Sequence, residues 1–513
     1  MMRLRPESPL GRDYVAQGST RGRVVGQGGP ALGAALAALL ATACSPEPPP
    51  EAAANLLLIS LDTLRADHLQ PYGYDRETSP HLADLAKRSV LFERVYSQAP
   101  TTAPSHATIL SGRYPSAHGV EFVSPGTAGQ IQEENPLAIT SMDPGVPLLA
   151  EILREAGWNC EAVTGGGMML PAIGFDRGFR RFLASSATIR PSISDRVAEG
   201  RQAVARLRSE TAPWFLLMHT YEPHRPYLPP EGWDRWSRNT EAAQFVRNTQ
   251  ETWATIGRMI TDPAGLPPQI SKQLLDMSAD TPIALAASDL YDGGIAWTDE
   301  VLGSWLAEMD RQGHLDDTVT VVTSDHGEEF GEAGIIGHGA LHESILHVPL
   351  LIHLPGNRLA GTRISAPTAL VDVLPTLLDL LDVPPPGRLD GHSLVRAMNT
   401  GALEPTPQFS EVRRRTHGTW VASVRTGRWA YAERIEPARM PKHLYDLLAD
   451  PAAENNLVPQ GLAALKDWQP PVEVTRALEK FVLAQRAADA ARTPTDAPEL
   501  SPEELERLHA LGY

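Results

Sequence analysis

Two aspartates stand just after runs of apolar residues and are the first candidates for chemistry. Asp62 follows residues 55–61 (NLLLISL), and Asp325 follows residues 318–323 (TVTVVT) and one serine. Continuous apolar runs of this length are typical of strands buried on both faces of a parallel sheet. The carboxyl ends of parallel strands meet at the edge of an α/β sheet where ligands bind. We therefore expect the two carboxylates to share a site.

Hydroxyl and imidazole groups that could bind a metal or attack an ester recur in further short segments. They are Thr102 and His106 in TAPSH, His224 in EPHRP, His326 directly after the second aspartate, and His338 between two glycines. Carboxylates and imidazoles bind divalent metals, and a metal can activate a nearby hydroxyl as a nucleophile. An isolated Asp–His pair at a strand end is more often only a capped turn. No one of these segments therefore establishes a metal site by itself.

The elements that must position these residues alternate between strand and helix patterns. Residues 214–219 (WFLLMH) form a third apolar run, while residues 147–156 and 299–312 have apolar side chains at helical spacing ahead of a glycine. Alternating strands and helices predict an α/β fold with a doubly wound, mostly parallel sheet. Residues 235–290 are polar with mixed signals, and we expect them to form a helical insertion beside the site.

The pattern changes after residue 398. Short β-like runs at 420–424 and 429–432, with a Thr-Gly turn between them, predict antiparallel strands in a small α+β unit. We predict a signal or lipoprotein segment with a Pro-rich tether at 1–54, the main catalytic domain at 55–398, a small C-terminal subdomain at 399–470, and a helical tail at 471–513.

Composition limits the possible partners. The chain has 513 residues and a formal net charge of −17, so most of its surface would repel nucleic acid. An anionic small substrate remains possible because a metal ion can reverse the local field. The only two cysteines are Cys44 and Cys160. Because the first lies in a predicted export segment, we expect no disulfide within the folded body.

The N-terminal segment reads as an export signal. Arg21 and Arg23 precede residues 31–43, which are nearly all Ala, Leu and Gly and too few for a comfortable permanent membrane span. The run ends in Ala-Thr-Ala-Cys, which resembles a bacterial lipoprotein cleavage site at Cys44. The proline-rich stretch that follows reads as a tether. We expect an exported protein, periplasmic or on the outer surface, held to the membrane if Cys44 is lipidated; an ordinary signal peptide cut near residue 43 is the alternative.

Taken in order, the segments resemble the sulfatase family within the alkaline phosphatase superfamily. The resemblance covers roughly residues 55–394 and continues into the C-terminal unit. Besides the segments above, it is carried by GFDRGF at 174–179, VPLLI at 348–352, VRTGRW at 424–429 and LYDL at 444–447. It implies the doubly wound fold with a small C-terminal α+β antiparallel subdomain, hydrolysis of ester bonds, and a divalent metal.

The resemblance also implies the metal ligands. The family's strand-end aspartates fall on Asp62 and Asp325. His326 stands where calcium sulfatases have asparagine, and the superfamily's phosphatases use this Asp–His pair. Thr63 replaces the second of two adjacent aspartates. Losing an oxygen anion and gaining an imidazole favours zinc or manganese over calcium. We predict a metal set of Asp62, Thr102, Asp325 and His326.

Thr102 stands where sulfatases place the cysteine or serine that becomes formylglycine. Threonine has neither a thiol nor a primary alcohol, so it cannot undergo that conversion. Its hydroxyl can still attack an ester if a metal lowers its pKa. Thr101 is a neighbouring candidate, but Pro104 fixes the register on Thr102. Thr102 could also, or instead, be the N-cap of the following helix.

Three histidines complete the predicted catalytic set. His106 replaces the motif's arginine and could orient Thr102, bind a phosphoryl oxygen, or serve only the structure. His224 matches a histidine expected to contact the substrate or leaving group, and His338 replaces a lysine that neutralises sulfate. Glu222, His224 and His338 could instead hold a second metal.

The substrate expected from these departures is a phosphorus ester. The family's sulfate-binding Gly-Lys-Trp-His stretch is replaced by TGGGMM at 164–169. We therefore predict a hydrolase for phosphate or phosphonate esters, acting on a small or a glycan- or lipid-linked anionic ester. The alternatives are a sulfatase without formylglycine, a phosphoglycerol- or phosphoethanolamine-type transferase, and a noncatalytic binding lipoprotein.

Overall fold

The computed structural model describes residues 55–123, 138–185, 192–237, 240–248, 278–332, 334–414, 418–437, 439–459, 462–465, 468–493, 495, 498 and 500–510. The predicted signal and lipoprotein segment lies outside them. Residues 52–513 belong to one compact unit. Across the described ranges, no helix is both long enough and apolar enough to cross a bilayer.

A large, mostly parallel sheet organises the described chain. Its order is β12-β2-β11-β8-β1-β7-β5-β6, with β13 also pairing with β2. Only β11 runs antiparallel to its neighbours β2 and β8. The strands are β1 (Asn55–Leu61), β2 (Val90–Tyr96), β5 (Asn159–Thr164), β6 (Arg181–Ala184), β7 (Trp214–Thr220), β8 (Thr318–Thr323), β11 (His347–His353), β12 (Arg363–Ile364) and β13 (Thr368–Ala369).

Strand β1 lies at the centre of this sheet, between β7 and β8. Leu58 pairs with Leu217 of β7 on one side and with Val321 of β8 on the other, both in parallel register. All three strands are buried along their whole length, as their continuous apolar sequences predicted. Because the three run in one direction, the residues that follow them meet at one edge.

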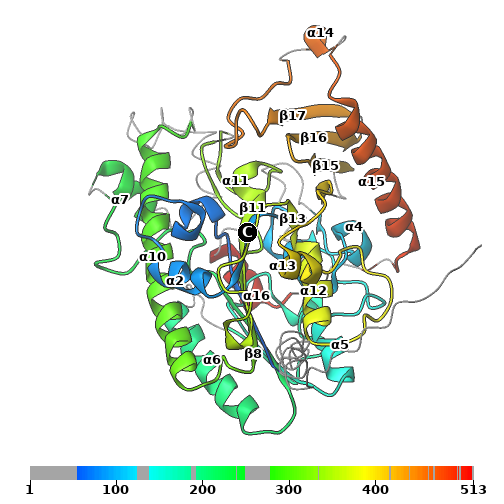
Figure 1. Cartoon of the computed structure of the whole chain (residues 1–513). Helices are drawn as coiled ribbons and strands as arrows, with labels where there is room; N and C mark the ends of the chain where they lie inside the picture. Colours follow the sequence, from blue (N-terminus) through cyan, green and yellow to red (C-terminus); the bar gives the residue numbers. More distant parts are fainter. Residues whose placement is uncertain are drawn as a thin grey trace, which may run out of the picture. The chain divides into compact units, whose positions relative to one another are not determined.

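Helices cover both faces of the sheet, so the predicted doubly wound fold is confirmed. Leu56 and Leu58 of β1 pack in one apolar cluster with α3 (Thr102–Ser111), α5 (Leu149–Glu155) and α12 (Val373–Leu380). Leu57 and Ile59 pack in a second cluster with α2 (Pro80–Lys87), α6 (Ile193–Arg208) and α10 (Pro282–Arg311). The two helix groups stand on opposite sides of the sheet in Figure 1. This alternation along β1 is what a strand with two buried faces requires.

Helix α10 is longer than the predicted helix at 299–312. It begins at Pro282, so its residues 282–290 lie in the stretch expected to be an insertion. Helix α7 (Glu241–Asn248), from the same stretch, packs against it. Gly293 and Gly294 weaken the helical pattern in the sequence. A close backbone contact explains Gly293, because a Cβ on this residue would lie 2.5 Å from the Trp233 carbonyl oxygen. The loop after β7 therefore lies directly on this helix.

A second sheet forms in the C-terminal part of the chain. Strands β14 (Gln408–Arg414), β15 (Thr419–Arg425), β16 (Trp429–Glu436) and β17 (Met440–Asp446) pair antiparallel in sequence order. The edge of β14 receives β3 (Phe122–Val123) and, beyond it, β4 (Ala138–Ile139). Helix α15 (Val472–Ala491) packs against β15. The sheet is thus built from two distant stretches of sequence.

Candidate metal centre

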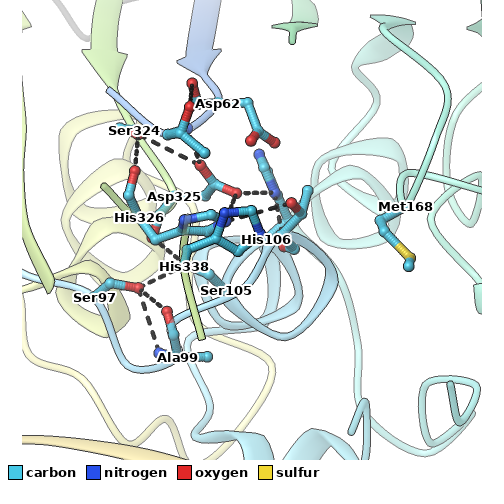
Figure 2. A network of polar contacts seen from close by, with 12 residues as sticks. Asp62, Ser97, Ala99, Ser105, His106, Met168, Ser324, Asp325, His326 and His338 are labelled. Carbon is cyan, nitrogen blue, oxygen red and sulfur yellow. Dashed lines mark hydrogen bonds and ion pairs between the residues drawn. The ribbon is translucent and has the colours of Figure 1, made fainter. Parts of the chain in front are cut away.

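Asp62, Asp325 and His326 come together at the carboxyl edge of β1 and β8. One potential ligand atom of each lies within 4.8 Å of the others, and all three residues are fully buried. Figure 2 shows Asp325 between Asp62 and His326, with His106 and His338 close by. The strand-end argument made from the sequence therefore placed the two aspartates correctly.

His326 presents the right ring nitrogen for a metal. Its Nδ1 lies 2.9 Å from the carbonyl oxygen of Gly327 and must donate a hydrogen bond to it. The lone pair of Nε2 then faces Asp325 Oδ2 and Thr102 Oγ1, each 3.4 Å away. Ligands at about 2.1 Å from a tetrahedral ion are roughly 3.4 Å apart. The donor set and its spacing fit a divalent cation.

Protein donors satisfy only one oxygen of each carboxylate in this group. Within the described chain, no hydrogen bond of normal geometry reaches Asp62 Oδ1 or Asp325 Oδ2. Burial, and then the charge of Asp325, raises the pKa of Asp62 well above its usual range, while the Thr102 hydroxyl opposes this shift. Burial also acts on Asp325, but His326, His106 and His219 outweigh it and lower the pKa of Asp325 to about 2. Two buried carboxylates this close call for a bound cation.

The backbone between the ligands is strained and held from several sides. Thr63 has a φ of 57°, which is unusual for a β-branched residue and costs about 1–3 kcal/mol. Its N–H donates to Asp325 Oδ1 at 3.3 Å, and its carbonyl accepts from the Tyr291 hydroxyl at 2.7 Å. Ser324 Oγ accepts from the Leu64 N–H at 2.9 Å. These bonds fix the spacing between the β1 and β8 ends.

Thr102 is the first residue of α3 and not its N-cap. Thr101 occupies the N-cap position with extended backbone and makes no side-chain capping bond. Thr102 is fully buried with its hydroxyl toward His326, whereas Thr101 is half-buried. The expectation that Thr102 might cap the helix is therefore wrong by one residue. Its hydroxyl instead lies beside the metal group formed by Asp62, Asp325 and His326.

His106 lies in the centre with both ring nitrogens engaged. Nδ1 must donate to the Thr102 carbonyl oxygen at 2.9 Å, so Nε2 accepts from the Ser60 hydroxyl at 2.8 Å. Burial lowers the pKa of His106, while Asp325 opposes that shift. These contacts make it a residue that positions the first turn of α3. They leave neither nitrogen for a phosphoryl oxygen.

His219 is a member of the centre that the sequence did not single out. The Gly165 N–H donates to Nδ1 at 3.2 Å, so Nε2 carries the proton and donates to Asp62 Oδ2 at 3.1 Å. A partner of this kind orients a ligating carboxylate. A histidine ending an apolar run beside the Asp62 strand was the only available signal.

A second polar group lies next to the metal group. The His338 ring centroid lies 4.5 Å from that of His326 and 5.2 Å from that of His224. His338 Nδ1 donates to Glu328 Oε1 at 2.9 Å, and His224 Nδ1 donates to the Arg225 carbonyl at 2.5 Å. Burial lowers the pKa of both histidines well below the usual range and raises that of Glu328. The structure thus places the rings of His224 and His338 next to each other.

Glu222 does not join them as the second-metal hypothesis required. Its Oε2 accepts from the Ile193 N–H at 2.7 Å, at the start of α6. The carboxylate beside His338 is Glu328, which the sequence analysis did not select. Among the described residues, no group of three His, Cys, Asp or Glu ligands forms around His224 and His338.

A doubly wound sheet with a buried Asp–Asp–His group at its carboxyl edge is the architecture of the metal-dependent ester hydrolases of the alkaline phosphatase superfamily. The chain belongs to the sulfatase family, whose model matches residues 54–383. This membership makes it an ester-bond hydrolase.

Individual relatives span most of the chain. A choline-sulfatase of Rhizobium meliloti is 27% identical over 490 residues, covering 85% of this chain and 90% of the relative. The phosphonate monoester hydrolase of Agrobacterium radiobacter has a similar structure, with a TM-score of 0.61, 23% identity, and coverage of 85% and 96% of the two chains. A structure in complex with its substrate D-glucosamine-2-N,6-O-disulfate gives a TM-score of 0.63 at 18% identity, covering 85% and 99%. These structural likenesses show the shared fold.

Proposed function

We propose that this protein hydrolyses phosphate or phosphonate esters with Thr102 as a metal-activated nucleophile. The observation that carries the proposal is the position of the Thr102 hydroxyl. It is fully buried, 3.4 Å from the metal-facing nitrogen of His326, and close enough to Asp62 to oppose the rise that burial causes in the pKa of that carboxyl. Asp62, Asp325, His326 and Thr102 would hold the cation.

The reaction would proceed in two displacements at phosphorus. A bound divalent cation would lower the pKa of the Thr102 hydroxyl and neutralise charge on the phosphoryl oxygens. The Thr102 oxygen forms a bond to phosphorus, and the bond from phosphorus to the ester oxygen breaks. The proton of the Thr102 hydroxyl passes to water, and the departing alkoxide takes a proton from water on the side where His224 and His338 lie. Water then cleaves the phosphorus–threonine bond and restores the hydroxyl.

The choice of phosphorus over sulfur follows from the missing aldehyde. A formylglycine diol can expel sulfate by collapse of a hemiacetal, but a sulfated threonine has no such exit and must be cleaved at sulfur. We expect kcat/KM for a nitrophenyl phosphodiester or phosphonate monoester to exceed that for the matching nitrophenyl sulfate at least tenfold, about 1.4 kcal/mol of transition-state stabilisation. Parallel assays of the metal-loaded protein would measure this ratio.

A sulfatase without formylglycine is the second candidate, favoured by the 27% identity to a choline-sulfatase. If a sulfate ester were turned over faster than every phosphorus ester in the same assay, this second function would replace the first. Transfer of the phosphoryl group to an acceptor alcohol shares the first displacement and would appear as a product other than free acid.

We also propose that the protein is exported and anchored through a lipid on Cys44. Support comes from the basic, apolar and small-residue pattern that ends at this cysteine. Cells grown with a fatty-acid analogue should label the protein, and Cys44→Ala should abolish the label and move the protein to the soluble fraction. Equal, unlabelled membrane association of both forms would contradict the anchor.

A further inference from the structure

The candidate metal centre contains too many carboxylates to attract an anionic ester by itself. Ionised Asp62 and Asp325 would cancel the charge of a divalent cation, and Glu328 adds a third carboxylate close by. An ester group entering this site carries at least one negative charge. Efficient binding therefore requires a further cation near the metal position.

Two arginines lie close to this edge of the sheet. Arg65 is buried, and its guanidinium is held in ion pairs by Asp67 and Glu332. Arg225 lies on the loop after β7, directly beside His224, and its side chain is half-buried. Whether Arg225 can supply a positive charge at the site depends on where its guanidinium lies.

The Arg225 guanidinium lies against Gly337, next to His338. A Cβ built on Gly337 would come within 2.7 Å of Arg225 Nη1 and 4.0 Å of Glu328 Oε1. Any larger residue would displace the guanidinium, and the φ of 126° at Gly337 also disfavours a side chain. Since Glu328 Oε1 accepts from His338, the arginine, the carboxylate and the imidazole converge at one place. The His338 ring is in turn 4.5 Å from His326.

We propose that Arg225 binds the anionic oxygen atoms of the ester group, and of the released oxyanion, at the metal centre. The substrate class that follows is an ester whose reacting group keeps a negative charge, as phosphate diesters and phosphonate monoesters do. A guanidinium suits this role because its planar N–H groups can bind two oxygens of one anion. The inference rests on the proposed function for the identity of the ester.

The test uses orthophosphate as the probe and needs no turnover. Calorimetric titration of the metal-loaded protein should show orthophosphate binding at least tenfold weaker in Arg225→Met than in the wild type. Arg225→Lys should recover part of that loss, and metal content should be unchanged in both. Arg88→Met, which removes an arginine paired with Asp310 and remote in sequence from the site, is the matched control and should bind like the wild type.

Glu328→Gln separates anion binding from a purely structural pairing. If Arg225 binds the anion, removing the adjacent carboxylate charge should leave orthophosphate binding unchanged or tighter, the opposite of Arg225→Met. Equal weakening by both variants would show that Arg225 acts only through Glu328, and would overturn the proposal. The proposal would also be overturned if Arg225→Met bound orthophosphate as tightly as the wild type, or if the wild type did not bind orthophosphate at all. Arg225-dependent binding without hydrolysis of any phosphorus ester would instead reject the proposed function alone.

Discussion

Thr102→Ala should lower kcat/KM for the best phosphorus ester by at least about 10³-fold, roughly 4 kcal/mol of transition-state stabilisation. The substitution removes the oxygen that would form the covalent bond to phosphorus. It leaves Asp62, Asp325 and His326 in place, and alanine suits the first turn of a helix. Steady-state kinetics would measure the loss of kcat/KM, and metal analysis of the same preparation would show that the metal is retained.

Thr101→Ala is the matched control for this experiment. Thr101 is the adjacent threonine, half-buried, and its side chain makes no capping bond. Its loss should change kcat/KM by less than about threefold. Thr102→Ser keeps a hydroxyl and should retain more activity than Thr102→Ala. Wild-type rates in Thr102→Ala would remove the nucleophile assignment.

Asp325→Ala should release the metal and lower kcat/KM by about 10³-fold or more. This carboxylate is part of the buried Asp62–Asp325–His326 group, and it also accepts the Thr63 N–H. Its removal takes away one anionic ligand and the bond that holds the strained turn. Elemental analysis should find zinc or manganese in the wild type and less than a tenth of that amount in the variant.

Asp310→Ala removes an exposed carboxylate paired with Arg88 and should keep its metal and activity. Full metal occupancy in Asp325→Ala would contradict the ligand assignment. Stoichiometric calcium in a fully active wild type would instead contradict the preference inferred from His326 and Thr63.

The central part of the fold could be predicted because its strands are buried on both faces. The segments that became β1, β7 and β8 consist mostly of apolar and β-branched residues, so no knowledge of their neighbours was needed. Strand β2 contains Glu93 and Arg94, and β14 contains Glu411 and Arg413, and neither was predicted. Only the C-terminal half of helix α10 was predicted, because Gly293 and Gly294 weaken the helical pattern. Both glycines lie against the loop after β7, a contact that the sequence does not reveal.

The site was predictable as far as the strand ends determine it. Asp62 and Asp325 had to meet once their strands were neighbours, and His326 follows one of them. Which carboxylate reaches His338 depends on the path of two loops. The second-metal alternative named Glu222, but the structure places Glu328 there. The role of His219 depends on which ring nitrogen carries the proton, which only its Gly165 and Asp62 contacts reveal.

The mixed origin of the C-terminal sheet bears on how the chain folds during synthesis. Helix α4 (Pro115–His118) follows α3 closely, and its Ser116 donates from N–H and hydroxyl to Glu411, 295 residues later. Strand β3, which also pairs with β4, likewise meets β14 only after the ribosome has made residue 414. A nascent chain stopped at residue 398 would therefore expose unpaired strand edges next to the helix that carries Thr102. Such a fragment should be inactive and prone to aggregation, so the last quarter of the polypeptide acts as an obligatory late step in assembling the catalytic end of the sheet.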